Sequence, residues 1–211
     1  MQTGPTPSAQ ALLQRSLSLR EQARNVVARL RVRELWEQLG PVFLVGSARF
    51  DLMVTPNVDF EVYVEHPDVR TGFAIMAEIA AVPGIRGVQH HNFMGTADPG
   101  LYWRVDYTAE DGTLWDFDIW LVPFSHPHAG MADAFASAME RTLTPETRLA
   151  ILRLKTDLAA QAVQCGTGPV RGIDIYRAVL EGGVRGTAAF SRWQADNPHP
   201  PMETWRPGSA A

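Results

Sequence analysis

Residues 44–62, which read LVGSARFDLMVTPNVDFEV, contain the pattern that decides the fold. Gly46 and Ser47 follow a short apolar segment that predicts a buried strand. A Gly-Ser turn can present backbone N–H groups and a hydroxyl to a phosphate. Asp59 and Glu61 are two positions apart on the next predicted strand, so both carboxylates point to the same face. A phosphate cradle beside carboxylates that can hold a small divalent cation is typical of phosphoryl or nucleotidyl transfer.

A second acidic strand is predicted later in the chain, over residues 113–122. Its apolar side chains alternate with Asp116, Asp118 and Trp120, which share the opposite face. One of these two aspartates is the candidate third acid, and the pattern alone leaves both open. Three carboxylates brought together repel one another unless a divalent ion lies among them, so metal binding is their natural explanation. The alternative is that they only line the wet face of a half-exposed sheet.

The hairpin between the last two predicted strands, 101–108 and 113–122, allows a prediction of register. If residues 110–112 form a three-residue loop with Gly112 in the left-handed conformation, facing residues have numbers that sum to 222. Arg104 then lies opposite Asp118. A two-residue loop would instead place Val105 there, so we favour the longer loop because it keeps polar residues together.

The remaining pattern predicts a mixed, mostly antiparallel sheet backed by helices, an α/β (α+β) fold with a helical C-terminal segment. Helical spacing covers residues 11–39 before Gly40 and Pro41, and a second helix is expected over 66–81. A short strand is expected over 86–91. The expected organisation is a nucleotidyltransferase-like core over 9–125, a helical segment over 126–195 and a flexible tail over 196–211.

Composition narrows the functional classes. The chain has 211 residues, 45% of them apolar, and no apolar run approaches membrane-spanning length. The N-terminus does not resemble a secretion signal, so we expect a cytoplasmic protein. The lone Cys165 excludes an internal disulfide and a multi-cysteine zinc site. A net charge of −4 makes nucleic acid a less favoured acceptor than a small molecule, although C-terminal arginines could form a local basic patch.

Several single residues are candidates for substrate contacts. Lys155 is the only lysine among 19 basic residues and lies on the apolar stripe of its predicted helix, so it either approaches a triphosphate or makes a surface ion pair. Arg49 could contact phosphate, and Arg104 could touch substrate or form only a cross-strand ion pair. Tyr176 could stack on a base, although its place on the apolar stripe of its predicted helix favours a core position. Trp120 could line one side of a substrate pocket.

These stretches resemble the DNA-polymerase-β-type nucleotidyltransferase superfamily. The resemblance rests on GS at 46–47, DFE at 59–61 and FDIW at 117–120, and covers about residues 25–122. The stretches 151–155 and 174–180 are similar to those that follow the core in small uncharacterised bacterial members. Glu61 stands where the superfamily more often has Asp.

The resemblance implies a Mg²⁺-dependent, two-metal nucleotidyltransferase. Gly46 and Ser47 would hold the β- and γ-phosphates of an NTP, with ATP the first choice. Asp59 and Glu61 would bind the metal ions, and Asp118 would help hold the second and take the proton of the attacking hydroxyl. The acceptor would be a hydroxyl or phosphate on a small molecule or protein.

Two other hypotheses remain. The first is an inactive relative that binds nucleotide or a protein partner. The second is a His-dependent metallohydrolase, which would use the histidines at 90–91 or at 126 and 128 but has no matching third ligand.

Overall fold

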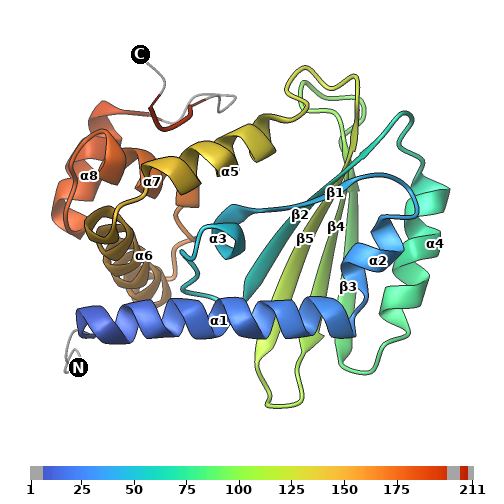
Figure 1. Cartoon of the computed structure of the whole chain (residues 1–211), viewed down its shortest axis with the longest axis horizontal. Helices are drawn as coiled ribbons and strands as arrows, with labels where there is room; N and C mark the ends of the chain where they lie inside the picture. Colours follow the sequence, from blue (N-terminus) through green and yellow to red (C-terminus); the bar gives the residue numbers. More distant parts are fainter. Residues whose placement is uncertain (1–6, 199–204, 209–211) are drawn as a thin grey trace.

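The computed structural model describes residues 7–198 and 205–208, and its centre is a five-stranded sheet (Figure 1). The strand order is β1-β2-β5-β4-β3. β2 and β5 are parallel, whereas the other neighbours are antiparallel, which confirms the mixed, mostly antiparallel sheet. The strands are β1 (Val42–Val45), β2 (Asn57–Val64), β3 (Ile85–Asn92), β4 (Leu101–Thr108) and β5 (Leu114–Pro123).

The helices form two groups around this sheet. α1, α2 and α4 pack against one face and bury the larger apolar cluster, while α5 to α8 gather at one side and enclose a second cluster (Figure 1). The helices are α1 (Ala9–Arg29), α2 (Val32–Trp36), α3 (Gly46–Arg49), α4 (Val69–Ala80), α5 (Met131–Thr142), α6 (Pro145–Cys165), α7 (Gly172–Leu180) and α8 (Thr187–Asp196). The long α1 contributes to both clusters and so connects them.

Alternation along β2 follows the sequence pattern. Val58, Phe60 and Val62 are fully buried under the helices, whereas Asp59 and Glu61 are partly exposed on the other face. Because side chains alternate along a strand, one strand supplies both the core and the acidic face.

The predicted register of the hairpin is confirmed. Arg104 pairs with Asp118, and Gly112 adopts a φ of +83° in the loop. A left-handed glycine closes a three-residue loop without steric cost, which fixes the pairing of every later residue on β5.

The first helix differs from the prediction, because it is interrupted within residues 11–39. α1 ends at Arg29, and Arg31 takes a left-handed φ of +53° before α2 begins. Leu30 and Val32 are both buried, at 0% and 1% exposure. Positions two apart point about 200° away from each other on a continuous helix, so the break lets both side chains enter the core.

The predicted tail lies partly outside the described residues, which omit 199–204 and 209–211. Within the described part, the Trp205 ring lies 6.0 Å from that of Phe135 and its indole N–H donates to Glu181 at 2.5 Å. No helix among the described residues is long and apolar enough to cross a membrane.

Candidate active site

The parallel pairing of β2 with β5 places two carboxylates side by side. Asp59 is the register partner of Asp118, whereas Asp116 pairs with Asn57, two residues earlier on each strand. Neighbouring strands are about 4.8 Å apart, so Asp59 and Asp118 occupy the same level of the acidic face. The register therefore favours Asp118 over Asp116 as the third acid.

The Gly-Ser turn lies directly against the first of these carboxylates. Val45, the last residue of β1, pairs with Asp59, and Gly46 follows with a φ of +66°. A Cβ added to Gly46 would come within 2.1 Å of the Asp59 carboxylate oxygen Oδ2. Only glycine fits both the backbone conformation and this approach, so the turn brings Ser47 to the candidate site.

Asp59 is in an environment that disfavours its charge. Burial is the main cause that raises the pKa of Asp59 to about 7, and the neighbouring Asp118 adds to it. The ammonium group of Lys155 acts in the opposite direction. Lys155 is one positive charge beside two carboxylates, Asp59 and Asp118. A further cation bound here would therefore be attracted to the site.

Lys155 reaches this site from α6, so its side chain points inward as its helix stripe predicts. Its Nζ donates to the carbonyl oxygen of Leu52 at 2.7 Å, and burial lowers the pKa of Lys155 to about 8. Tyr176 lies beside it, with its ring centroid 5.6 Å from Nζ. Tyr176 is 4% exposed and contacts the rings of Phe50 and Phe135, so it occupies a core position.

Glu61 does not join the pair formed by Asp59 and Asp118. The hydroxyl of Tyr63 donates to Glu61 at 2.6 Å. Burial raises the pKa of Glu61, and this hydrogen bond opposes the shift. Within the described residues, no group of three or more His, Cys, Asp or Glu side chains is placed to hold a metal ion. The expected convergence of three carboxylates is therefore absent from these positions, because Glu61 is hydrogen-bonded toward Tyr63.

Two residues that the sequence reasoning missed hold Asp118. The amide of Asn57 donates to one carboxylate oxygen at 2.9 Å, and the hydroxyl of Tyr102 donates to the other. Asn57 shares a face of β2 with Asp59, and the predicted hairpin register places Tyr102 opposite Trp120 on the acidic face. These two signals could have identified both residues.

The two candidate arginines are engaged elsewhere. Arg104 makes ion pairs with Asp106 and Asp116, at 3.0 and 3.3 Å. Arg49 makes ion pairs with Asp133 at 2.5 Å and Glu140 at 3.2 Å, both on α5. Contact of either guanidinium with a substrate requires exchange of these partners.

A cavity of about 670 Å³ lies next to Glu61 on the acidic face. Trp120 lines it, and its ring is stacked 5.4 Å from that of Phe93. His126 also lines it. Its Nε2–H donates to the Asp98 carboxylate at 2.9 Å, while its Nδ1 accepts the backbone N–H of His128 at 3.0 Å. Both ring nitrogens of His126 thus have protein partners, and the histidines form no metal cluster among the described residues.

No protein-family model and no curated protein matches the sequence. Solved structures do. A mutant of the Cid1 poly(U) polymerase bound to MgATP matches with a TM-score of 0.53 at 14% identity, over 77% of this chain and 50% of that chain. The MgGTP-bound form matches with a TM-score of 0.51, at 14% identity, over 77% and 50%. A cytoplasmic RNA terminal U-transferase matches with 0.50 at 12% identity, over 80% and 53%.

The chain has the nucleotidyltransferase fold. At these identities the likeness shows the fold alone, and the chain spans about half the length of the structures that it matches.

Proposed function

We propose that this chain is a Mg²⁺-dependent nucleotidyltransferase that moves a nucleoside monophosphate from an NTP, with ATP the first candidate, to a small-molecule or protein acceptor. The observation that carries the proposal is the meeting of three elements in this fold. β1 brings the turn at Gly46 against Asp59, and β5 brings Asp118 to the same level. A phosphate cradle beside paired carboxylates is suited to in-line displacement at phosphorus.

The chemistry of this donor set suits Mg²⁺, which prefers oxygen ligands and few protein side chains. Asp59 and Asp118 repel each other, and a divalent cation between them would remove that repulsion. Glu61 is on the same face of β2 and would complete the set after leaving the hydroxyl of Tyr63. Bound Mg²⁺ would neutralise charge on the phosphates and lower the pKa of an acceptor hydroxyl.

The protein groups then have separate tasks. The backbone amides of Gly46 and Ser47, with the Ser47 hydroxyl, hold the β- and γ-phosphates. Asp118 takes the proton from the attacking hydroxyl, while Asn57 and Tyr102 keep its carboxylate oriented. Lys155 supplies positive charge beside Asp59 and the triphosphate.

The acceptor is proposed to enter the cavity next to Glu61. Trp120 offers an aromatic surface there, and the volume of about 670 Å³ is within the range of small-molecule sites. The similar solved structures are of RNA-modifying transferases, but the net charge of −4 favours a small acceptor for this chain. Arg104, Arg49 and Tyr176 remain candidate substrate contacts only if their present partners are exchanged.

A second function is supported by one observation. Glu61 is satisfied by Tyr63, and Lys155 already lies beside Asp59, so the site could hold a nucleotide without turnover. On this alternative the chain binds nucleotide or a protein partner and does not catalyse transfer.

The test combines two measurements, the melting temperature in the presence of MgATP and the release of pyrophosphate. MgATP should raise the melting temperature of the wild type, and this shift should be lost in Asp59→Asn. With a panel of hydroxyl and phosphate acceptors, pyrophosphate release should fall about 10³-fold in Asp59→Asn. Asp106→Asn is the control, because Asp106 is a carboxylate on the same sheet that pairs with Arg104. A Mg²⁺-dependent melting shift without pyrophosphate release would favour the binding alternative, and no shift would overturn both.

A further inference from the structure

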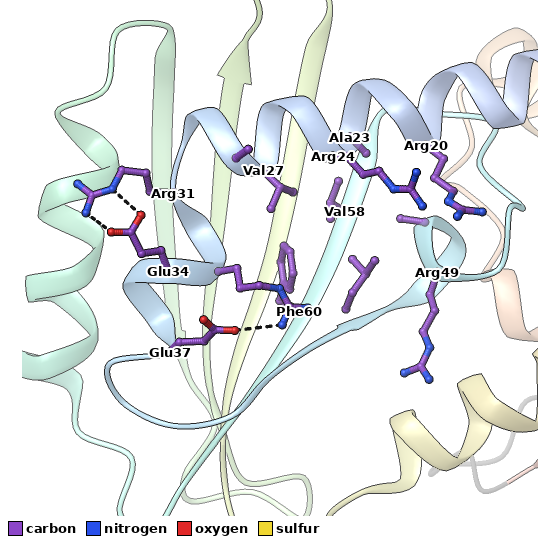
Figure 2. Close-up of a pocket in the computed structure, with 14 residues that line it drawn as sticks. Arg20, Ala23, Arg24, Val27, Arg31, Glu34, Glu37, Arg49, Val58 and Phe60 are labelled. Carbon is purple, nitrogen blue, oxygen red and sulfur yellow. Dashed lines mark hydrogen bonds and ion pairs between the residues drawn. The ribbon is translucent and has the colours of Figure 1, made fainter.

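A second cavity lies on the opposite face of the sheet from the carboxylates. It has a volume of about 550 Å³ and is bounded by α1, α2, the edge strand β1 and α3 (Figure 2). Val58 and Phe60 form its floor, and these residues alternate along β2 with Asp59 and Glu61. The sheet therefore lies between this cavity and the carboxylates, and Arg49 is the candidate site residue that also lines the cavity.

One face of α1 forms the wall of this cavity. Its lining positions follow helical spacing of three and four, so they share one side of the helix. Basic residues alternate there with small or apolar ones, and Figure 2 shows this face above the floor of the cavity. The small side chains leave space between helix and sheet. These positions are Arg20, Ala23, Arg24, Val27 and Ala28, and Arg31 lines the cavity just beyond the end of α1.

The rim of the cavity carries guanidinium groups that are each paired with a carboxylate, among them Arg20 with Asp51 and Arg33 with Glu37. Five arginines line it against two glutamates, Glu34 and Glu37. Arg31 pairs with Glu34 at 2.5 Å, and Arg24 pairs with Glu21 at 3.3 Å with both side chains more than half exposed. Exposed pairs of this kind contribute little free energy, so their guanidinium groups can exchange partners. Guanidinium groups bind carboxylate and phosphate oxygens in a planar, two-point geometry.

We propose that this cavity binds a small amphiphilic anion, namely a carboxylate or phosphate attached to an aliphatic or aromatic body. The apolar lining, with Val27 and Leu44 as its partly exposed members, takes the body, and the arginine rim takes the anionic group. Highly hydrated polyanions such as nucleic-acid strands would leave the partly exposed side chains of Val27 and Leu44 without a partner. The volume lies within the range of about 300–1,000 Å³ that small-molecule sites have. This site is additional to the proposed nucleotidyl transfer.

The probe is sodium dodecanoate at concentrations where it is monomeric, titrated by calorimetry, with dodecanol as the uncharged partner of equal chain length. Dodecanoate should bind the wild type with one-to-one stoichiometry, and dodecanol should bind at least about tenfold more weakly. Arg24→Gln should weaken dodecanoate binding about tenfold, whereas Arg153→Gln, on an exposed position of α6, should leave it unchanged. Ala28→Trp should fill the cavity and remove binding. Ala28 is exposed, and a native circular dichroism spectrum of the variant excludes loss of folding as the cause.

Further variants and probes decide where and how the ligand binds. Asp59→Asn should bind dodecanoate as the wild type does, which separates failure of this proposal from failure of the proposed transferase activity. Equal affinity for dodecanoate and dodecanol, or full binding to Ala28→Trp, would overturn the proposal. Binding to vesicles of anionic phospholipid without binding of free dodecanoate would overturn it as well, because it would indicate a membrane surface as the partner.

Discussion

Asp59 and Glu61 are two positions apart on the same face of the same strand, yet their surroundings differ. Asp59 lies between Gly46, Asp118 and Lys155, where burial and a like charge raise its pKa to about 7. Glu61 faces a cavity instead, and its carboxylate accepts a hydrogen bond from Tyr63. The strand determines which way a side chain points, but its neighbours determine its charge and its partner. Four measurements test whether the two carboxylates are in fact independent.

Gly46→Ala should have the largest effect and should act on Asp59 only. The new Cβ would lie 2.1 Å from the Asp59 carboxylate, and the φ of +66° is unfavourable for alanine. We expect a loss of about 3 kcal/mol in the free energy of unfolding, measured by urea denaturation. Gly95→Ala is the matched control, because its Cβ would meet no atom within 4 Å. Equal losses in both variants would contradict the close approach of Gly46 to Asp59.

The second prediction concerns pH. Asp59 binds its proton more tightly in the folded chain, with a pKa of about 7, than in the unfolded chain, where the ordinary value is 3.8. Its contribution to the free energy of unfolding is therefore lost as pH rises from about 4 to about 7, on the order of 3 kcal/mol. Asp59→Asn should lack this loss, so the free energy of unfolding of the variant should increase relative to that of the wild type across this pH range. Parallel stability curves for the two proteins would show that Asp59 titrates normally.

The third prediction separates Lys155 from the other neighbours of Asp59. Lys155→Met removes the positive charge that lowers the pKa of Asp59, so this pKa should rise above about 7. Titration of ¹³C-labelled aspartate and glutamate carboxyl carbons by NMR would measure it, with assignment through Asp59→Asn and Glu61→Gln. The pKa of Glu61 should stay unchanged, since its neighbours are Tyr63 and His126. A shift of both carboxylates would show that they are coupled.

Tyr63→Phe should have the smallest effect and should act on Glu61 only. It removes the hydrogen bond that lowers the pKa of Glu61, so this pKa should rise, while the pKa of Asp59 should stay at about 7. The Tyr63 hydroxyl also accepts the backbone N–H of Gly130 at 3.1 Å. The free energy of unfolding should therefore fall by about 2 kcal/mol, since each hydrogen bond usually contributes about 1 kcal/mol. If Glu61 must leave Tyr63 to bind Mg²⁺, the same variant should need less Mg²⁺ for half-maximal turnover. A higher requirement would show that Tyr63 positions Glu61 for the metal.

Much of the acidic face could be predicted because its causes are local. Alternation along residues 58–64 placed Asp59 and Glu61 opposite the apolar side chains, and the loop at Gly112 placed Arg104 opposite Asp118. The break at Arg31 was not predicted, because it depends on the burial of both Leu30 and Val32 by elements far along the chain. The roles of Asn57 and Tyr102 also require the neighbouring strands to be known.

The sequence by itself determined the strands, the face of each acidic side chain and the register of the hairpin, since strand period and turn geometry are properties of adjacent residues. Tertiary structure alone decided that β2 lies parallel to β5, which makes Asp59 the neighbour of Asp118 rather than Asp116. It also turned Glu61 toward Tyr63 and left an arginine-lined cavity under α1. Those outcomes depend on burial, charge and packing between residues that are distant in the chain, where local pattern carries no information.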